Sequence, residues 1–325
     1  MGAGLVLLIA YGGLFWFLRN PVVFGAAVSP GPAADVERLT RDVWALTSIK
    51  PSRSFRNPAA LSLAGSYIET EFAESGCAVD EQKVPLFGNM YRNVTCSFGP
   101  RDGPRVIVGA HYDVQGANNP GADDNASGVA GILEIARLVG TAKPTLAHRL
   151  DLVAYTLEEV RGDVDGAEQV NIGSYFHARD LEQRGADVKL MISVEMIGFF
   201  SSEANSQSYP QPLSGLLKLV YPGTGDFIGI IGRAWDRSLV SRVKGLMSVS
   251  DTLPVYSINA PAFVPSIDRS DHQNFWATGY PAVMVTDTAE FRNPNYHQPS
   301  DAADTLDYLR MAKVVEGLYQ VAVGY

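Results

Sequence analysis

The sequence predicts an α/β fold with a mixed, mostly parallel central sheet and helices on both faces. Apolar strands alternate with helical segments along most of the 325 residues, which is typical of such layered sheets. The strands predicted at 105–110 and 282–286 are continuously apolar, as expected of strands that are covered on both faces. Internal repeats and low-complexity tracts are absent, so the globular part reads as one domain.

Helical spacing and good helix formers predict the first two helices at 33–46 and 58–74. Two strands at 77–85 and 90–98 follow, with a turn near Phe87-Gly88. We then expect a strand at 105–110, a helix at 127–139, a strand at 148–157, a helix at 173–184, a strand at 188–196, a strand at 226–232, a helix at 238–247, a strand at 254–258, a helix at 270–277, a strand at 282–286 and a closing helix at 303–322.

Composition limits the function classes. With 46% hydrophobic residues the chain can bury a large core. The net charge of −9 argues against a nucleic-acid binder, which usually presents a basic face.

The N-terminal segment, residues 1–27, differs from the rest. Residues 2–18 carry no charge, and roughly 17–25 apolar residues are needed to span a membrane. Residues 24–28 resemble a small-residue cleavage site, but no Lys or Arg precedes the apolar run and Arg19 follows it. We expect export, with an uncleaved membrane anchor favoured over a cleaved signal. The domain at 28–325 would then lie outside the cytoplasm, membrane-anchored or periplasmic or secreted.

The two cysteines lie in the strands predicted around the Phe87-Gly88 turn. Pairing these strands about residues 86 and 87 places Cys77 opposite Cys96. A cross-strand disulfide is plausible there in an oxidising compartment. The alternative is two small buried residues that never meet.

Several polar residues fall where apolar strands end. His111, Glu158, Glu159 and Glu195 all follow or close a predicted strand. Ligands bind at the carboxyl ends of the strands in sheets of this kind. We therefore expect these side chains to meet at one edge of the sheet.

The pair Glu158-Glu159 is the strongest signal. Two adjacent glutamates at the end of a buried strand repel one another, unless one coordinates a metal and the other acts on bound water. Zinc lowers the pKa of bound water to roughly 7, so a nearby carboxylate can take its proton. Asp123-Asp124 is weaker because Asp also caps helices, although two carboxylates in a cleft favour a cation.

Two histidines have carboxylates nearby in sequence. Asp113 could hold the second ring nitrogen of His111, as zinc-bound histidines usually require. Asp301 could do the same for His297, for which a solvated loop histidine is the alternative. His148 and His177 are expected to be packed or surface histidines.

In this order the motifs His111-x-Asp113, Gly121 to Gly128, Glu158-Glu159, Glu195-Met-Ile-Gly and Tyr296-His297-x-x-x-Asp301 resemble the co-catalytic zinc aminopeptidases. That family also contains glutamate carboxypeptidase and the bacterial leucyl aminopeptidases. The similarity runs from about Arg53 to the C-terminus and includes Ser270-Asp271-His272 and Gly279-Tyr280-Pro281.

The resemblance implies a zinc-peptidase α/β/α sandwich that holds two Zn²⁺ ions. By position, Asp123 would bridge both ions, and the Asp123–Asp124 bond would be cis. His111 and Glu195 would complete one site, Glu159 and His297 the other. Co²⁺ or Mn²⁺ would fit the same ligands.

The catalytic groups follow from the same resemblance. Glu158 would be the general base that acts on a metal-bridging water, with Asp113 behind His111. Tyr296 could donate to the oxyanion. The implied reaction is removal of N-terminal residues from peptides by a metallopeptidase domain spanning 28–325.

The sequence departs from the family pattern at two places, and three alternative functions remain open. An acidic insertion at 160–172 precedes Gly173-Ser174, and Glu195 stands where many relatives have Asp. A zinc carboxypeptidase would need a cation from Arg233, Arg237, Arg269 or Arg292, and a glutaminyl cyclase would use a single zinc. A non-catalytic, membrane-tethered binding domain is the third alternative. Pocket walls are expected from residues 199–200, 204–223 and 264–269.

Overall fold

The computed structural model describes residues 8, 11–13, 15–16, 18–20, 31–160, 172–248, 253–261 and 264–325. Most of the uncharged N-terminal segment, the cleavage site expected at 24–28 and the insertion at 161–171 lie outside the described residues. Among the described residues, no helix combines the length and the apolar character that a membrane span needs.

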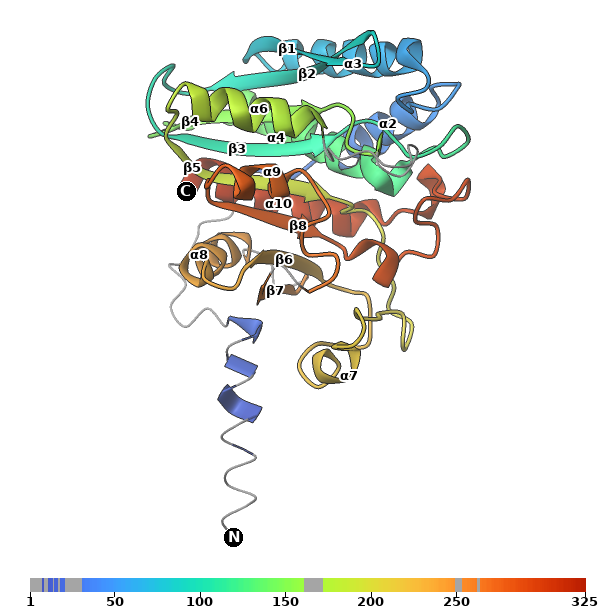
Figure 1. Cartoon of the computed structure of the whole chain (residues 1–325), viewed down its shortest axis with the longest axis vertical. Coiled ribbons are helices and arrows are strands. Elements are labelled where there is room, and N and C mark those ends of the chain that lie inside the picture. The colour runs from blue at the N-terminus through green and yellow to red at the C-terminus, as the bar shows by residue number, and fades with distance from the viewer. Residues whose placement is uncertain are drawn as a thin grey trace.

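The centre of the fold is an eight-stranded mixed sheet in the order β1-β2-β4-β3-β5-β8-β6-β7 (Figure 1). Parallel pairing joins β3 to β4 and β5, β5 to β8, and β6 to β7, whereas β1–β2, β2–β4 and β6–β8 are antiparallel. The prediction of a mixed, mostly parallel sheet is confirmed. The strands are β1 (Ala78–Leu86), β2 (Asn89–Phe98), β3 (Arg105–His111), β4 (Arg149–Tyr155), β5 (Val188–Glu195), β6 (Ile228–Arg233), β7 (Val255–Ala260) and β8 (Ala282–Thr286).

Alternate residues of the central strands pack into different cores on the two faces of the sheet. Val106 and Val108 of β3 belong to the larger core, and Ile107 between them belongs to the smaller one. Successive side chains of a strand point to opposite faces, so both faces of β3 are covered. This accounts for the unbroken apolar sequence of these strands.

Helices supply the cover on each face. The larger core contains residues of α2 (Val36–Thr47), α3 (Pro58–Glu74), α4 (Gly128–Ala142), α8 (Arg237–Met247) and α10 (Tyr308–Gly324). The smaller core contains residues of α6 (Ile172–Gln183) and α9 (His272–Ala277). The short elements are η1 (Ala122–Ser127), α7 (Ser214–Leu217), η2 (Ala289–Phe291) and η3 (Ala303–Thr305).

The predicted elements are present with small shifts in their ends. The clearest difference is the closing helix, which was expected from residue 303. The chain instead makes the short turn η3, and α10 begins at Tyr308. Asp307 fixes that start because its side chain accepts a hydrogen bond from the backbone N–H of Arg310, which satisfies a free donor of the first helical turn.

The register of the hairpin β1–β2 differs from the predicted register by two residues. Leu86 pairs with Asn89, so the turn consists of Phe87 and Gly88. Both have positive φ, 47° and 76°, as a two-residue type I′ turn requires. Cys96 therefore lies opposite Val79 rather than opposite Cys77.

The disulfide is nevertheless present. Cys77 precedes β1 and is bonded to Cys96, with their Cα atoms 5.5 Å apart. Of the two alternatives that the sequence left open, the structure shows the bridge. It ties the edge strand β1 to its neighbour β2.

His272, at the start of α9, is fully buried. Its Nε2 lies 2.8 Å from the carbonyl oxygen of Ile267, and its ring packs edge-on against Trp276 at a centroid distance of 4.4 Å. Burial lowers the pKa of His272 to about 4, because the charged imidazolium would lose its hydration.

This shift predicts a pH-dependent stability. Between pH 6.5 and about 4 the unfolded chain protonates His272 and the folded chain does not, so stability falls as the pH falls through this range. The full difference corresponds to about 3 kcal/mol, at about 1.36 kcal/mol per pKa unit. His272→Gln keeps an N–H donor and removes the titration, so its free energy of unfolding should fall less steeply with acid.

Urea unfolding of the wild type and of His272→Gln, followed by circular dichroism at several pH values from 7.5 to 4.5, measures both slopes. Near-ultraviolet dichroism at pH 7.5 checks that the variant is packed. Equal slopes in the two proteins would contradict the assignment.

Candidate metal centre

The strand ends meet as expected. β3 ends at His111 and β5 at Glu195, and Glu158-Glu159 follow β4 by a short turn. β3 pairs in parallel with both neighbours, which brings these three ends to one edge of the sheet. The loop after η2 adds His297, and η1 adds Asp124.

Asp124 lies between the two imidazoles. Its Oδ1 is 3.3 Å from Nε2 of His111, and its Oδ2 is 3.1 Å from Nε2 of His297. Nε2 of His111 is also 3.3 Å from Glu195 Oε1, and Nε2 of His297 is 3.0 Å from Glu159 Oε1. Two sets of donors therefore share one carboxylate, one set on each of its oxygens.

The adjacent residue, Asp123, had been predicted as the carboxylate shared by both sets, but the structure places Asp124 between the imidazoles. The carboxylate of Asp123 accepts hydrogen bonds from the N–H of Gly198 at 2.9 Å and from Nδ2 of Asn293 at 2.7 Å. Its oxygens are thus occupied by structural donors. The cis peptide bond is also one residue further on, between Asp124 and Asn125.

Asp301 holds the backbone of the two aspartates. Its carboxylate accepts from the N–H of Asp123 at 2.9 Å and from the N–H of Asp124 at 3.1 Å. The prediction had placed Asp301 behind His297. The contacts instead make it the support of η1, which presents Asp124 to the centre.

Asp113 has a comparable part on the other side. Its carboxylate accepts from the N–H groups of Glu158 and Glu159, both at 2.9 Å. Nδ1 of His111 is 3.2 Å from the backbone oxygen of Asp113 and 3.6 Å from its carboxylate. Asp113 therefore lies beside Nδ1 of His111, with its backbone oxygen nearer than its carboxylate, and its carboxylate fixes the backbone of both glutamates.

Two further residues support the centre and were not singled out for it in the sequence. Ser270 donates to Oε2 of Glu195 at 2.6 Å. The side chain of Asn125 donates to the carbonyl of Val194 and accepts from the N–H of Met196. It therefore fixes the backbone on both sides of Glu195. The motif Ser270-Asp271-His272 carried a signal for the first of these residues, but no rule of spacing assigns it a partner.

The electrostatics show a cluster that requires positive charge. Burial raises the pKa of Glu159 to about 8, and burial also raises the pKa of Glu158 well above its usual range. Burial lowers the pKa of His297, but its close contacts with the carboxylates of Asp124 and Glu159 outweigh this effect and raise the pKa to about 11. For Asp124, burial raises the pKa, and the two histidines reverse the shift to well below the usual value.

The residues fit a divalent metal. Both carboxylate oxygens of Asp124 are buried, and among the described residues their polar contacts are the ion-pair contacts with the two imidazoles, an arrangement that a cation shared by these groups would stabilise. Imidazole nitrogens and carboxylate oxygens are the ligands that zinc accepts. Asp124, His111 and Glu195 form one group with ligand atoms within 4.8 Å, and Asp124, Glu159 and His297 form another.

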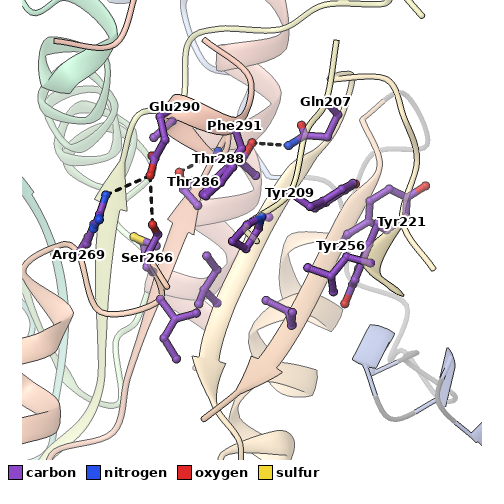
Figure 2. A pocket seen from close by; sticks show the side chains of 18 of the residues that line it. Gln207, Tyr209, Tyr221, Tyr256, Ser266, Arg269, Thr286, Thr288, Glu290 and Phe291 are labelled. Atoms are coloured by element: carbon purple, nitrogen blue, oxygen red, sulfur yellow. Dashed lines mark hydrogen bonds and ion pairs between the residues drawn. The ribbon is translucent and has the colours of Figure 1, made fainter. Parts of the chain in front are cut away.

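A largely apolar pocket of about 120 Å³ adjoins the centre, with Glu195 and Tyr296 in its lining. Figure 2 shows Tyr209, Tyr221 and Tyr256 on one side and Arg269 with Glu290 on the other. The loops expected at 204–223 and 264–269 contribute to the lining, whereas residues 199–200 do not. The apolar and aromatic lining includes Tyr209, Leu217, Tyr221, Phe227, Tyr256, Ile258, Val264 and Ile267.

Tyr296 stands between pocket and centre. Its ring stacks on His297 with the centroids 3.7 Å apart. Burial raises the pKa of Tyr296 above its usual value, so its hydroxyl stays protonated at neutral pH.

The four arginines considered for a carboxypeptidase all have local partners. Arg233 pairs with Asp236 at 2.6 Å, and Arg269 pairs with Glu290 at 3.1 Å. Arg292 donates to Gln207 and to the carbonyl of Phe227, and Arg237 donates to the carbonyl of Trp16. Of the four, Arg269 lines the pocket.

The chain is similar to several known proteins. The sequence model of peptidase family M28 matches residues 93–226. Protein YfbL of Escherichia coli (strain K12) is 43% identical over 320 residues, which cover 94% of each chain. A probable leucine aminopeptidase of Arthroderma otae is 25% identical over 295 residues, or 86% of this chain and 70% of the relative.

Solved structures share the fold at lower sequence identity. The LapA aminopeptidase of Legionella pneumophila has a TM-score of 0.71 at 19% identity, over 89% of this chain and 71% of that one. A glutaminyl cyclase of Bacteroides thetaiotaomicron has a TM-score of 0.67 at 17% identity, over 91% and 99% of the two chains.

Proposed function

We propose that this chain, which belongs to peptidase family M28, is an aminopeptidase that removes N-terminal residues from peptides at a two-metal centre. Members of the family are zinc-dependent peptidases, and the chain is a hydrolase of that type. The observation that carries the proposal is the buried carboxylate of Asp124, whose two oxygens each lie close to Nε2 of a different histidine, at 3.3 Å from His111 and 3.1 Å from His297.

The ligands divide into two sets. His111 and Glu195 would hold one zinc ion, and Glu159 and His297 the other, with Asp124 shared by both. When bound, the ions would acidify a water molecule and polarise the scissile carbonyl. Glu158 is left outside both sets and belongs to a third group with His111 and Glu159.

Glu158 is the proposed general base. Its backbone N–H is held by the carboxylate of Asp113, and a carboxylate beside a metal-bound water can take a proton from it. Glu158 would take a proton from the water as its oxygen attacks the carbonyl carbon. The same proton would pass to the leaving amine nitrogen as the C–N bond breaks. Tyr296, protonated and beside His297, would donate to the oxyanion.

The pocket indicates the side chain that is bound. Its aromatic and aliphatic lining would take an apolar N-terminal residue, with the scissile carbonyl at the Glu195 and Tyr296 end. Relatives named as probable leucine aminopeptidases support the same preference.

The rivals are less well supported by the site. A carboxypeptidase needs a cation for the terminal carboxylate, and Arg269 in the pocket is already paired with Glu290. A glutaminyl cyclase with one zinc would not need both ligand sets, and both are complete here. A non-catalytic binding domain would not require Glu158 to be retained beside complete ligand sets.

We also propose that the domain is exported, as an anchored or a released protein. The disulfide between Cys77 and Cys96 supports an oxidising compartment, and the uncharged run at 2–18 supports an anchor or a signal.

Product mass spectrometry on a mixed peptide library tests the function. The full chain is incubated with zinc, and a chelator-treated sample is the control. Loss of single N-terminal residues, sensitive to the chelator, is expected. C-terminal trimming would instead indicate a carboxypeptidase, and ammonia loss from N-terminal glutamine a cyclase.

Glu158→Gln should abolish turnover without removing metal. The amide keeps the size of the side chain but cannot accept the proton, so kcat should fall by at least about 100-fold. Zinc content measured by plasma mass spectrometry should equal that of the wild type. Near-normal turnover in this variant would exclude Glu158 as the base.

The two neighbouring aspartates provide a matched pair of variants. Asp124→Asn should lose zinc, because its amide cannot serve two ions with negative oxygens. Asp123→Asn should keep zinc and lose stability instead, because the new amide faces the Nδ2 group of Asn293. Zinc content and thermal unfolding of both variants decide the assignment, and the reverse pattern would restore Asp123 as the bridging residue.

A further inference from the structure

Arg19 and Asn20 of the N-terminal segment form hydrogen bonds with the outer strand β7 and with helix α8. The carbonyl of Arg19 accepts from Nζ of Lys244 at 2.9 Å and from Oγ of Ser257 at 3.0 Å. Nδ2 of Asn20 donates to the carbonyl of Arg237 at 2.9 Å. Residues 19 and 20 are thus held at several points and pack against the domain.

A further hydrogen bond joins the N-terminal residues to a side chain that lines the pocket. The hydroxyl of Tyr221 donates to the carbonyl of Leu18 at 2.9 Å and lies 2.8 Å from the carbonyl of Ser257. Tyr221 and Ser257 both line the pocket. The side chains of Phe15 and Leu18 pack against the small apolar cluster that contains Tyr221.

The side chain of Arg19 makes the second connection. Its guanidinium carbon lies 4.2 Å from the ring centroid of Tyr256 and 4.9 Å from that of Phe15. Both distances are within the range of cation–π attraction. Tyr256 lines the pocket, so Arg19 contacts a pocket-lining ring.

The rings of this wall also contact one another. Tyr256 packs against Phe227 at a centroid distance of 5.0 Å and against Tyr221 at 6.3 Å, and Tyr221 packs against Tyr209 at 6.0 Å. Figure 2 shows Tyr209, Tyr221 and Tyr256 together on one side of the pocket. A shift of Tyr256 would therefore change the shape of the whole aromatic wall.

We propose that Arg19 is a positioning residue for the substrate pocket, so that the N-terminal segment sets the preference for large apolar side chains through Tyr256. Arg19 does not itself need to touch substrate. The inference rests on the proposed function, because it takes this pocket to be the site of the N-terminal side chain. It gives the segment before the domain a part in selecting substrate, in addition to any part in export.

The test compares phenylalanyl and alanyl p-nitroanilides as substrates of the full chain. In Arg19→Ala, kcat/KM for the phenylalanyl substrate should fall about five- to tenfold, chiefly through KM, as expected for loss of one cation–π contact. For the alanyl substrate, whose side chain is a single methyl group, kcat/KM should change less than about twofold, because this side chain offers little surface to the aromatic wall. Arg19→Lys should show a smaller loss, because the ammonium keeps the charge but not the flat guanidinium.

Arg184→Ala is the matched control. It removes an arginine whose side chain is 73% exposed and pairs with Asp180, and it should leave both substrates unchanged. A double-mutant cycle with Tyr256→Leu isolates the contact, because Arg19→Ala should cost little more once the ring is gone. Zinc content and the thermal midpoint are measured for every variant.

The outcomes separate the two levels of proposal. If the wild type hydrolyses neither anilide nor any library peptide, the proposed function fails. If the wild type is active but Arg19→Ala affects both anilides equally, or neither, the positioning role is overturned. Additive losses in the cycle would also overturn it, since they would show that Arg19 acts independently of Tyr256.

Discussion

The buried carboxylate of Asp124 is the constraint on which the rest of the site depends. A carboxylate inside a protein must be compensated by hydrogen bonds or by positive charge, and among the described residues the two imidazoles are the groups that contact the Asp124 oxygens. Its position is set from behind, by Asp301 at its own backbone and by Asn125 after it. The imidazoles on either side complete an arrangement that only a cation or shared protons can balance.

The supporting residues obey a common logic. The carboxylates of Asp113 and Asp301 each accept hydrogen bonds from two consecutive backbone N–H groups. The residues whose backbone is held in this way are Glu158 with Glu159 and Asp123 with Asp124. Their side chains either point into the centre or hydrogen-bond to neighbouring segments that support it. The carboxylates at this sheet edge therefore divide into those that present ligands and those that hold the presenting loops.

The sequence was informative where a side chain follows from the strand that carries it. His111, Glu159 and Glu195 could be placed because strand ends meet at a sheet edge. Asp123 and Asp124 could not be told apart, since both are adjacent carboxylates in the same loop and the deciding donors, Gly198 and Asn293, are distant in sequence. The hairpin register failed for a related reason, because it depends on the backbone angles of Phe87 and Gly88. For the aromatic wall of the pocket, the sequence predicted only which loops line it and not which rings meet. The ring contacts join β7, the region of α7 and the N-terminal segment, which are distant in sequence.

The disulfide has a consequence for the chemistry of the centre. The chain contains two cysteines, and both are consumed by the Cys77–Cys96 bridge. The candidate ligands are accordingly all oxygen and nitrogen donors, and none can be oxidised to a sulfenic acid or captured in a mixed disulfide. The candidate ligands of the centre therefore include no thiol that a change of redox conditions could modify. A reducing environment would break the bridge between β1 and β2 at the edge of the sheet. It would not change the chemical nature of the candidate metal ligands.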